Sequence, residues 1–180
     1  MLDLTVYCTE INKNCSIQAK LELEAYKMKH LDKIDKSILR EIQMDGRISN
    51  VELSKRINLS PSPCLDRVKR LEKEGFIERY GAVLNPVLLG YDMFAYVSVT
   101  LDKTTNDSFA FFQEEIRQVK EVIECDMVAG GFDYLLKICV SNMKNYRTVL
   151  GQIAEVSGVS QTHTYIVIES IKKNKGLHIK

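Results

Sequence analysis

The sequence of 180 residues has no apolar run that approaches the roughly 20 residues needed to span a bilayer. It also lacks a secretion signal, because charged residues interrupt the apolar ones near the N-terminus: Asp3, Glu10, Lys13 and Lys20. These two absences argue against a membrane protein and against a secreted one. We therefore expect a protein of the cytoplasm that has no membrane partner.

The cysteines show no pattern of a disulfide or metal-bound framework. The five cysteines are an odd number and include no C-x-x-C pair, which argues against disulfides and against a structural zinc site. Cys125 and Cys139 lie in strand-like runs, where we expect small, buried and inert side chains. Cys64 lies at the start of a predicted helix, whose N-terminus can lower the pKa of a thiol, although inert packing is the favoured interpretation.

Catalytic motifs are absent as well. The sequence contains no glycine-rich phosphate loop, no H-E-x-x-H pair and no nucleophile elbow. His30, His163 and His178 are far apart and have no clustered carboxylates beside them. We expect neither an enzyme nor a metal site nor a cofactor, and we expect His163 to be structural or at the surface.

What the sequence does contain is a local excess of positive charge on a chain of net charge +1. Residues 47–73 hold seven basic side chains against three acidic ones, Glu52, Asp66 and Glu72. The basic residues are Arg47, Lys55, Arg56, Arg67, Lys69, Arg70 and Lys73. A basic patch on a nearly neutral chain is typical of a dedicated nucleic-acid contact surface rather than of general stickiness.

The apolar spacing around this patch predicts three helices. The first covers 31–43, with Asp32 as its N-cap and with Asp45-Gly46 ending it, where Gly46 is free to take a positive φ. Its apolar residues recur at helical spacing: Leu31, Ile34, Ile38 and Ile42. Ser49 begins the second helix and forms the pattern of a capping box with Glu52.

The third helix is expected over 63–74, with Ser62 as its cap, Pro63 in the first turn and Gly75 after its end. Its inward residues are expected to be Leu65, Val68 and Leu71, which leaves Arg67, Lys69, Arg70 and Lys73 outward. Residues 76–84 look extended and predict one or two short strands, a wing, beside the helices. Together these elements indicate a winged helix-turn-helix.

From Phe94 the apolar period changes to two, which predicts a second domain. Strands are expected over 94–101, 122–128, 134–140 and 162–171, and helices over 106–119 and 142–155. The order βαββαβ is the ferredoxin-like pattern, in which two helices cover one face of an antiparallel sheet. The other face also reads as apolar, so we expect a second copy of the chain to cover it. The predicted fold class is α+β.

In a helix-turn-helix, the N-terminal part of the last helix enters the major groove of double-stranded DNA. Ser62, Asp66 and Arg67 are therefore expected nearest to base edges. The remaining predicted contacts, mostly to phosphates, are Asn50, Ser54, Lys55, Arg56, Lys69, Arg70 and Lys73. The alternative is that the basic helix is a solvated face or contacts a protein partner.

Three segments, in this order, resemble the Lrp/AsnC (feast/famine) family of transcription regulators: GRISNVELSKRINLSPSPCLDRVKRLEKEGFIERYGAVLNP, GGFDYLLK and TYIVIE. The resemblance covers about 31–175. It implies a DNA-binding domain and a βαββαβ domain that binds an amino acid such as leucine between dimers. It also implies self-association through the sheets into dimers and further into assemblies that are often octamers.

The positions that match the family's effector site are Gly130, Gly131, Asp133, Tyr134, Met143, Thr164, Tyr165 and Ile166. The family usually has Gly-Asp-Phe-Asp where this chain has Gly-Gly-Phe-Asp. Gly131 therefore removes a carboxylate that could order the loop or approach an ammonium group, which leaves the effector's identity open. Without the family, Gly130 and Gly131 read as a hairpin turn and Asp133 as a structural cap.

We thus divide the chain into an N-terminal extension (1–30), a helix-turn-helix DNA-binding domain (31–80), a linker strand and hinge (81–92), a βαββαβ effector-binding and oligomerisation domain (93–172) and a tail (173–180). Met28 is a possible natural start, and we expect the residues before it to be poorly packed. The expected function is sequence-specific transcriptional regulation that responds to a small amino acid. The alternative is an amino-acid-binding regulatory module of a metabolic enzyme system with no specific DNA site.

Overall fold

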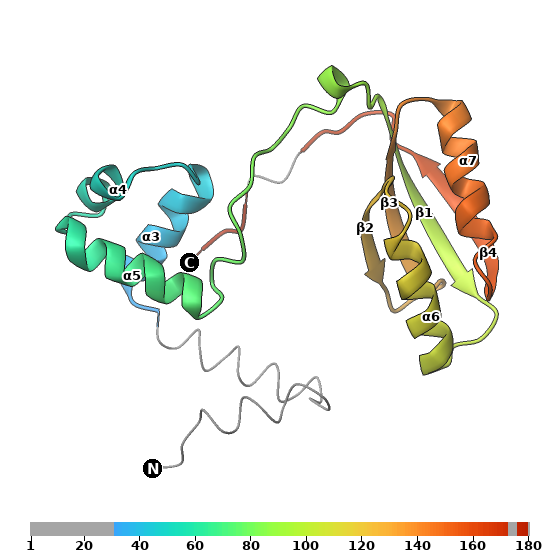
Figure 1. Ribbon diagram of the computed structural model, residues 1–180, viewed down its shortest axis with the longest axis horizontal. Helices are drawn as coiled ribbons and strands as arrows, with labels where there is room; N and C mark the ends of the chain where they lie inside the picture. The colour runs from blue at the N-terminus through green and yellow to red at the C-terminus, as the bar shows by residue number, and fades with distance from the viewer. Residues whose placement is uncertain (1–30, 173–175, 180) are drawn as a thin grey trace, which may run out of the picture. The chain divides into compact units, whose positions relative to one another are not determined.

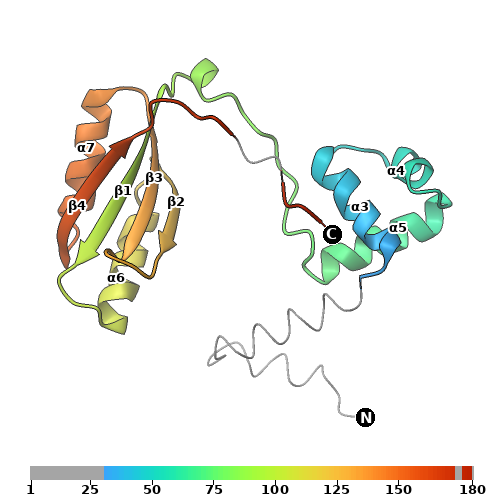
Figure 2. The same ribbon diagram turned by 180° about the vertical axis from the view of Figure 1, so that it is seen from behind.

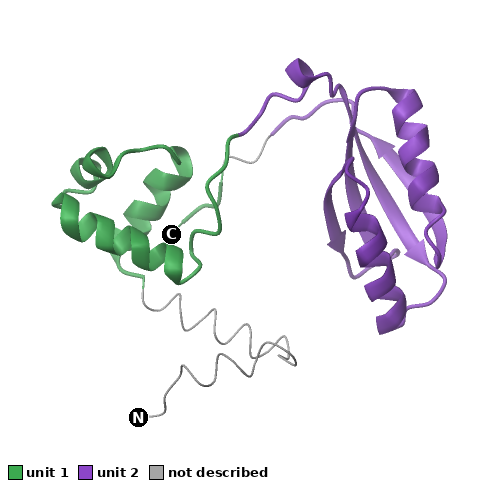
Figure 3. Ribbon diagram, viewed as in Figure 1, with its two compact units in different colours: residues 1–82, 174–180 green, residues 83–173 purple. Residues whose placement is uncertain are grey.

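The computed structural model describes residues 31–172 and 176–179 of the chain. The prediction for the N-terminal extension lies outside these residues. The chain divides into two compact units, residues 1–82 with 174–180 and residues 83–173 (Figure 3). Within the described ranges, no helix combines the length and the hydrophobicity that crossing a membrane requires.

The first unit contains the three predicted helices, α3 (Lys33–Met44), α4 (Asn50–Arg56) and α5 (Pro61–Lys73) (Figure 1). Its fully buried apolar residues come from all three helices: Ile38, Leu53, Cys64 and Leu71. Asn58 takes a φ of 55° in the turn between α4 and α5, a conformation that asparagine adopts more readily than most residues. The helix-turn-helix prediction is confirmed.

Two predicted helix ends differ in detail. Asp45, in an extended conformation, ends α3 as predicted, but Gly46 does not adopt a positive φ. Ser49 does accept a hydrogen bond from the Glu52 backbone N–H at 3.2 Å, but Glu52 pairs with Arg56, so only half of the predicted capping box forms. The complete box lies on α3, where Asp32 and Asp35 each accept from the other's backbone N–H.

Helix α5 begins two residues earlier than predicted. Ser60 is its N-cap, so Pro61 and Pro63 both lie in the first turn, where a missing N–H costs no intrahelical bond. Cys64 rather than Leu65 faces the core, since Leu65 is 40% exposed. Burial raises the pKa of the Cys64 thiol, opposite to the lowering that a helix N-terminus can produce.

The strands expected after α5 are not formed. Gly75 does end the helix with a φ of 81°, but residues 78–85 have no regular secondary structure, and a short 3₁₀ helix, η2 (Val87–Leu89), follows. An extended segment becomes a strand only where another segment exchanges hydrogen bonds with it, and the sequence pattern alone does not supply that neighbour.

The second unit has the predicted ferredoxin-like order: β1 (Met93–Leu101), α6 (Asn106–Arg117), β2 (Val122–Met127), β3 (Tyr134–Val140), α7 (Met143–Ala154) and β4 (Val159–Ile166). The strands form one antiparallel sheet in the order β2-β3-β1-β4. Both helices cover the same face, and Figure 2 shows the sheet from the uncovered side. Strand β4 begins directly after Gly158, at a φ of 91°, and ends at Ile166, so the predicted range 162–171 is shifted.

The uncovered face of the sheet is mixed rather than uniformly apolar. Tyr96 and Tyr165 are direct cross-strand neighbours on this face, and Tyr165 is 60% exposed. On the β2 side, Lys137 instead forms an ion pair with Glu124 at 2.9 Å. Cys125, on the outer strand β2, is exposed rather than buried as predicted.

Candidate DNA-contact and effector sites

The predicted DNA-contact residues fall into an accessible group and an internally bonded group. The accessible residues lie on α4 and α5 with exposed side chains, and in the described part of the chain none of them makes an ion pair: Lys55, Ser62, Asp66, Lys69 and Lys73. Three lysines are therefore available to anionic partners outside the protein. Ser62 and Asp66 lie in the N-terminal half of α5, the part that enters the major groove in a helix-turn-helix.

Asn50 and Ser54 support α4 instead. Ser54 is 2% exposed, and its hydroxyl donates to the carbonyl of Val51 at 2.9 Å, so it is not accessible to DNA in this structure. The Asn50 amide donates to the carbonyl of Pro61 at 2.8 Å and thereby joins the start of α4 to the start of α5. Both side chains therefore stabilise the backbone of the helix-turn-helix rather than form part of its DNA-facing surface.

Arg67 and Arg70, predicted to face outward, are held by the first helix. Arg67 Nη1 lies 2.6 Å from Asp32 Oδ2 and 2.8 Å from Asp35 Oδ1. Arg70 Nη2 lies 2.5 Å from the second oxygen of Asp35, whose side chain is 1% exposed. We call these four residues the α3–α5 charge cluster, and it fixes α5 against α3.

The charge cluster shifts the pKa of two of its members, Asp32 and Arg67. The pKa of Asp32 is lowered, chiefly because its carboxylate accepts the backbone N–H of Asp35 and then because it pairs with Arg67. The pKa of Arg67 is raised by its hydrogen bonds to Asp32 and Asp35. Each shift favours the charged form, so Asp32 and Arg67 stabilise each other as an ion pair.

Arg56 is likewise bonded inside the unit. It lies 3.0 Å from Glu41 on α3 and 3.3 Å from Glu52 on its own helix. Its side chain is 44% exposed, so these pairs are open to solvent and weaker than those of a buried carboxylate.

The predicted effector residues near the β2–β3 loop serve the fold in two cases. Asp133 accepts the backbone N–H of Leu101 at 2.8 Å, and its own N–H donates to Val99, so it is a structural cap between strands. Tyr134 is 1% exposed, packs against Phe112 at a ring distance of 4.5 Å and accepts from Gln113. Tyr134 is thus a core residue rather than the wall of a site.

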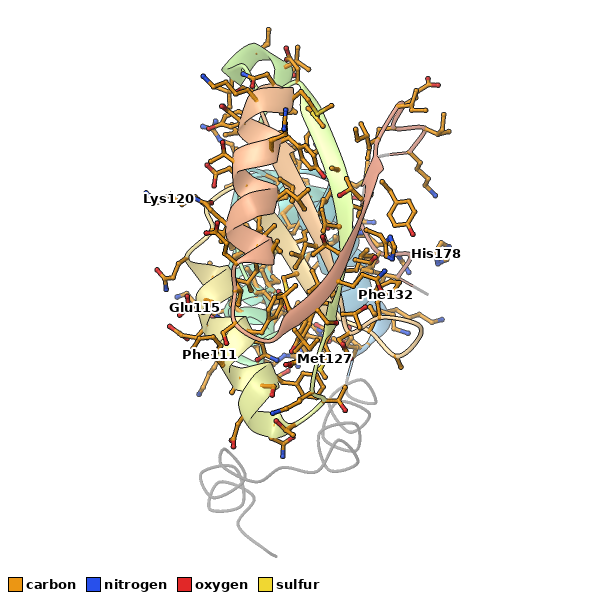
Figure 4. The ribbon with its side chains drawn as sticks, turned by 90° about the vertical axis from the view of Figure 1, so that its right-hand side faces the viewer. Phe111, Glu115, Lys120, Met127, Phe132 and His178 are labelled. Carbon is orange, nitrogen blue, oxygen red and sulfur yellow. The ribbon has the colours of Figure 1, made fainter. Side chains whose placement is uncertain are left out.

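Gly130 and Gly131 lie in the β2–β3 loop in open surroundings. A Cβ added to either would meet no atom within 4 Å, and neither has a positive φ. Two exposed apolar residues that the sequence analysis missed lie in this part of the unit: Met127, 54% exposed at the end of β2, and Phe111, 48% exposed on α6. Figure 4 labels both, together with Phe132 of the loop. The helical period could have indicated the exposure of Phe111, because Phe112 and Ile116 form the buried face of α6.

The other predicted effector residues lie toward α7. Met143 is the first residue of α7 and is 50% exposed. The Thr164 hydroxyl lies 2.5 Å from that of Tyr146, on the side of the sheet that α7 covers. Tyr165 points to the opposite face, while Ile166 is 48% exposed at the end of β4.

One chain does not bring the two groups together. The β2–β3 loop leads into Tyr134 at one end of β3, whereas Met143 follows Val140 at the other end. Seven extended residues separate these ends by roughly 20 Å, at about 3.4 Å per residue. That is more than one amino acid can bridge, so a site that uses both the β2–β3 loop and Met143 must take them from two chains.

Comparison with known proteins places these two units in context. The Lrp/AsnC ligand binding domain matches residues 94–177, and a winged helix-turn-helix DNA-binding domain matches residues 31–78. The leucine-responsive regulatory proteins of Escherichia coli K12 and Klebsiella pneumoniae are each 49% identical to the chain over 153 residues, which are 84% of this chain and 93% of theirs.

Two solved structures extend the similarity to the three-dimensional fold. A transcriptional regulator of Neisseria meningitidis in complex with L-methionine has a TM-score of 0.78 and 36% identity, covering 82% of this chain and 96% of that one. A feast or famine regulatory protein of M. tuberculosis, complexed with L-methionine, has a TM-score of 0.75 and 31% identity, covering 83% and 99%.

Proposed function

The chain belongs to the Lrp/AsnC family of transcription regulators, and we propose which of its surfaces contact DNA, effector and a second copy. It is a DNA-binding transcriptional regulator with an amino-acid effector-binding domain, and it is not an enzyme. Its DNA is the double helix that a helix-turn-helix addresses. Because a regulator acts where its DNA is held, we retain the cytoplasm as its proposed location.

We propose that α5 reads DNA with its N-terminal half and holds the backbone with three lysines. Ser62 and Asp66 would approach base edges, while Lys55, Lys69 and Lys73 would contact phosphates. The observation that carries this assignment is that these lysines are exposed and make no ion pair among the described residues. Arg56, Arg67 and Arg70 would act mainly by orienting the helices, because acidic groups of the same unit already bind them.

We further propose a dimer formed through the uncovered face of the sheet. The neighbouring Tyr96 and Tyr165 supply an exposed aromatic surface on the β1–β4 side of that face. Two recognition helices related by a two-fold axis would address half-sites one helical turn of DNA apart, roughly 34–36 Å. Assembly beyond the dimer, as far as the octamer, stays a prediction.

The effector is proposed to bind between copies of the chain. The β2–β3 loop and the Met143 end of the sheet are too far apart in one chain, so the predicted site requires both from different chains. Leucine and methionine are the first candidates, since one names the relatives and the other occupies two similar structures. Both are amino acids with apolar side chains of similar size.

The test is DNA binding by the full chain to a promoter fragment at increasing salt, with and without each amino acid. We expect log affinity to fall linearly with log salt, because phosphate contacts release counterions. We expect leucine or methionine to change either affinity or mass in light scattering, with a coupling of about 1–3 kcal/mol. Absence of specific DNA binding would instead favour an amino-acid-binding module without a DNA site.

A further inference from the structure

The described end of the C-terminal tail packs against the first helix of the DNA-binding unit. Residues 174–180 group with the first unit, although the segment just before them belongs to the βαββαβ unit. The side-chain amide of Gln43, on α3, donates to the carbonyl of Leu177 at 2.8 Å and accepts its backbone N–H at 2.8 Å. Arg40 Nε, one turn earlier, donates to the carbonyl of Ile179 at 3.2 Å.

These contacts recognise main chain rather than side chains. A glutamine amide holds a donor and an acceptor side by side, so it can pair with both the N–H and the C=O of one extended residue, as a neighbouring strand does. The Leu177 side chain remains 79% exposed and contributes little to the contact. Arg40 adds a charge-assisted hydrogen bond to a second carbonyl two residues further along.

The contact with Gln43 requires a glycine at position 176. Its φ is +107°, and a Cβ on it would lie 2.3 Å from Cδ of Gln43. Any other residue would therefore strain the backbone and collide with the amide that holds Leu177. A glycine at the point of closest approach is a second, independent feature that fits docking of this segment.

We propose that the face of α3 formed by Arg40 and Gln43 is a docking site for the C-terminal segment Gly176–Ile179 of the same chain. The polypeptide then joins the two units twice, once at residues 82–83 and again at 173–174. The second connection ends on α3, which also carries Asp32 and Asp35 of the α3–α5 charge cluster. The docked segment therefore contacts the helix that positions α5, and the functional consequence of this contact rests on the proposed function.

The docking is tested in the full chain by a photo-crosslinker that replaces the exposed Leu177 side chain, p-benzoylphenylalanine. We expect illumination to join residue 177 to the α3 peptide, where Met44 lies next to Gln43 and is 76% exposed. The product should migrate as a single chain. We expect Gln43→Ala and Gly176→Ala each to lower the yield about tenfold, because each removes the paired hydrogen bonds.

Gly81→Ala is the matched control, because its added Cβ would meet no atom within 4 Å and its φ is not positive. That variant should leave the yield unchanged. Equal yields in all three variants, or crosslinks outside α3, would overturn the docking site. A product of twice the mass would show that α3 receives the tail of another copy and would overturn the same-chain assignment. None of these results depends on DNA binding, so failure here is separable from failure of the proposed function.

Discussion

Arg67 and Asp35 form a hydrogen-bonded ion pair in which Arg67 Nη1 lies 2.8 Å from Asp35 Oδ1. The arginine belongs to the recognition helix α5, and the aspartate is buried on α3, 32 positions earlier in the chain. Arg70 contacts the same carboxylate at 2.5 Å. One buried acid therefore sets the position of two cations on α5, the helix that we propose contacts DNA, which makes Asp35 the first residue to test.

Asp35→Asn is expected to destabilise the DNA-binding unit. The variant keeps the side chain's shape but removes the countercharge of Arg67 and Arg70. Breaking a fully buried pair costs about 3–5 kcal/mol, and we expect roughly 1–3 kcal/mol here because both arginines are partly exposed. Urea denaturation followed by circular dichroism measures the change. The control is Asp66→Asn on the exposed surface of α5, and an equal loss in both variants would contradict the role of the cluster.

The charge cluster also predicts a pH dependence. The folded-state pKa of Asp32 lies below its ordinary value of 3.8, so its contribution to stability is complete above that value and is lost as the pH falls through the folded pKa. Wild type should therefore exceed Asp32→Asn in stability at pH 6, and the difference should shrink toward pH 3. Denaturation curves at the two pH values test this. A difference that does not change with pH would mean that charge is not its cause.

Lys73→Ala is expected to weaken binding to all DNA sequences alike. Loss of one phosphate contact should lower the slope of log affinity against log salt by about 1. Fluorescence anisotropy with a promoter fragment and with a scrambled fragment measures both slopes. Lys144→Ala, an exposed lysine on α7, serves as the control and should leave them unchanged. A change confined to the promoter fragment would point to base reading instead.

Tyr165→Asp is expected to weaken self-association. The substitution places a charge beside Tyr96 on the β1–β4 side of the uncovered sheet face, where a dimer would have to desolvate it. Light scattering over a range of protein concentrations should show dissociation at higher concentrations than in wild type. Val83→Asp is the control, since Val83 is 97% exposed outside the sheet. Unchanged mass in Tyr165→Asp would exclude this face as the dimer surface.

Gly131→Asp restores the carboxylate that the family usually has in the β2–β3 loop. The structure offers room for it, because a Cβ there meets no atom within 4 Å and the φ is not positive. If the carboxylate approaches the effector's ammonium group, affinity for leucine or methionine should rise about tenfold, as one charged hydrogen bond allows. Calorimetric titration measures the change, with Gly130→Asp as the neighbouring control. Equal affinity in Gly131→Asp and wild type would remove the loop from the site.

The bounds of an element were predicted correctly where one apolar period extends along its whole length. Strand β3 has the predicted bounds, Tyr134–Val140, because its alternate residues are all buried against the two helices. The start of α5 was predicted two residues too late, since Pro61 and Pro63 both fit the first turn and local chemistry does not choose between them. The missing wing strands depend on a hydrogen-bonding neighbour, which no local pattern specifies.

The candidate sites were harder to predict because their residues are defined by contacts between distant segments. Arg67 has the pattern of a DNA-reading residue on α5, and only the fold reveals that Asp35 already binds it. Ser54 lies next to Lys55 in sequence, yet one side chain is buried and the other is exposed. The effector positions match the family in sequence, but β3 separates the β2–β3 loop from Met143, which lie at its opposite ends.

That separation has a consequence for how the regulator would respond in a cell. A pocket completed only by a second chain appears when chains meet, so effector affinity rises with the amount of the regulator itself. By mass action, the effector in turn favours the assembled state, because it binds the shared pocket more tightly than it binds a single chain. The response of such a regulator would depend on its own concentration as well as on the concentration of the amino acid.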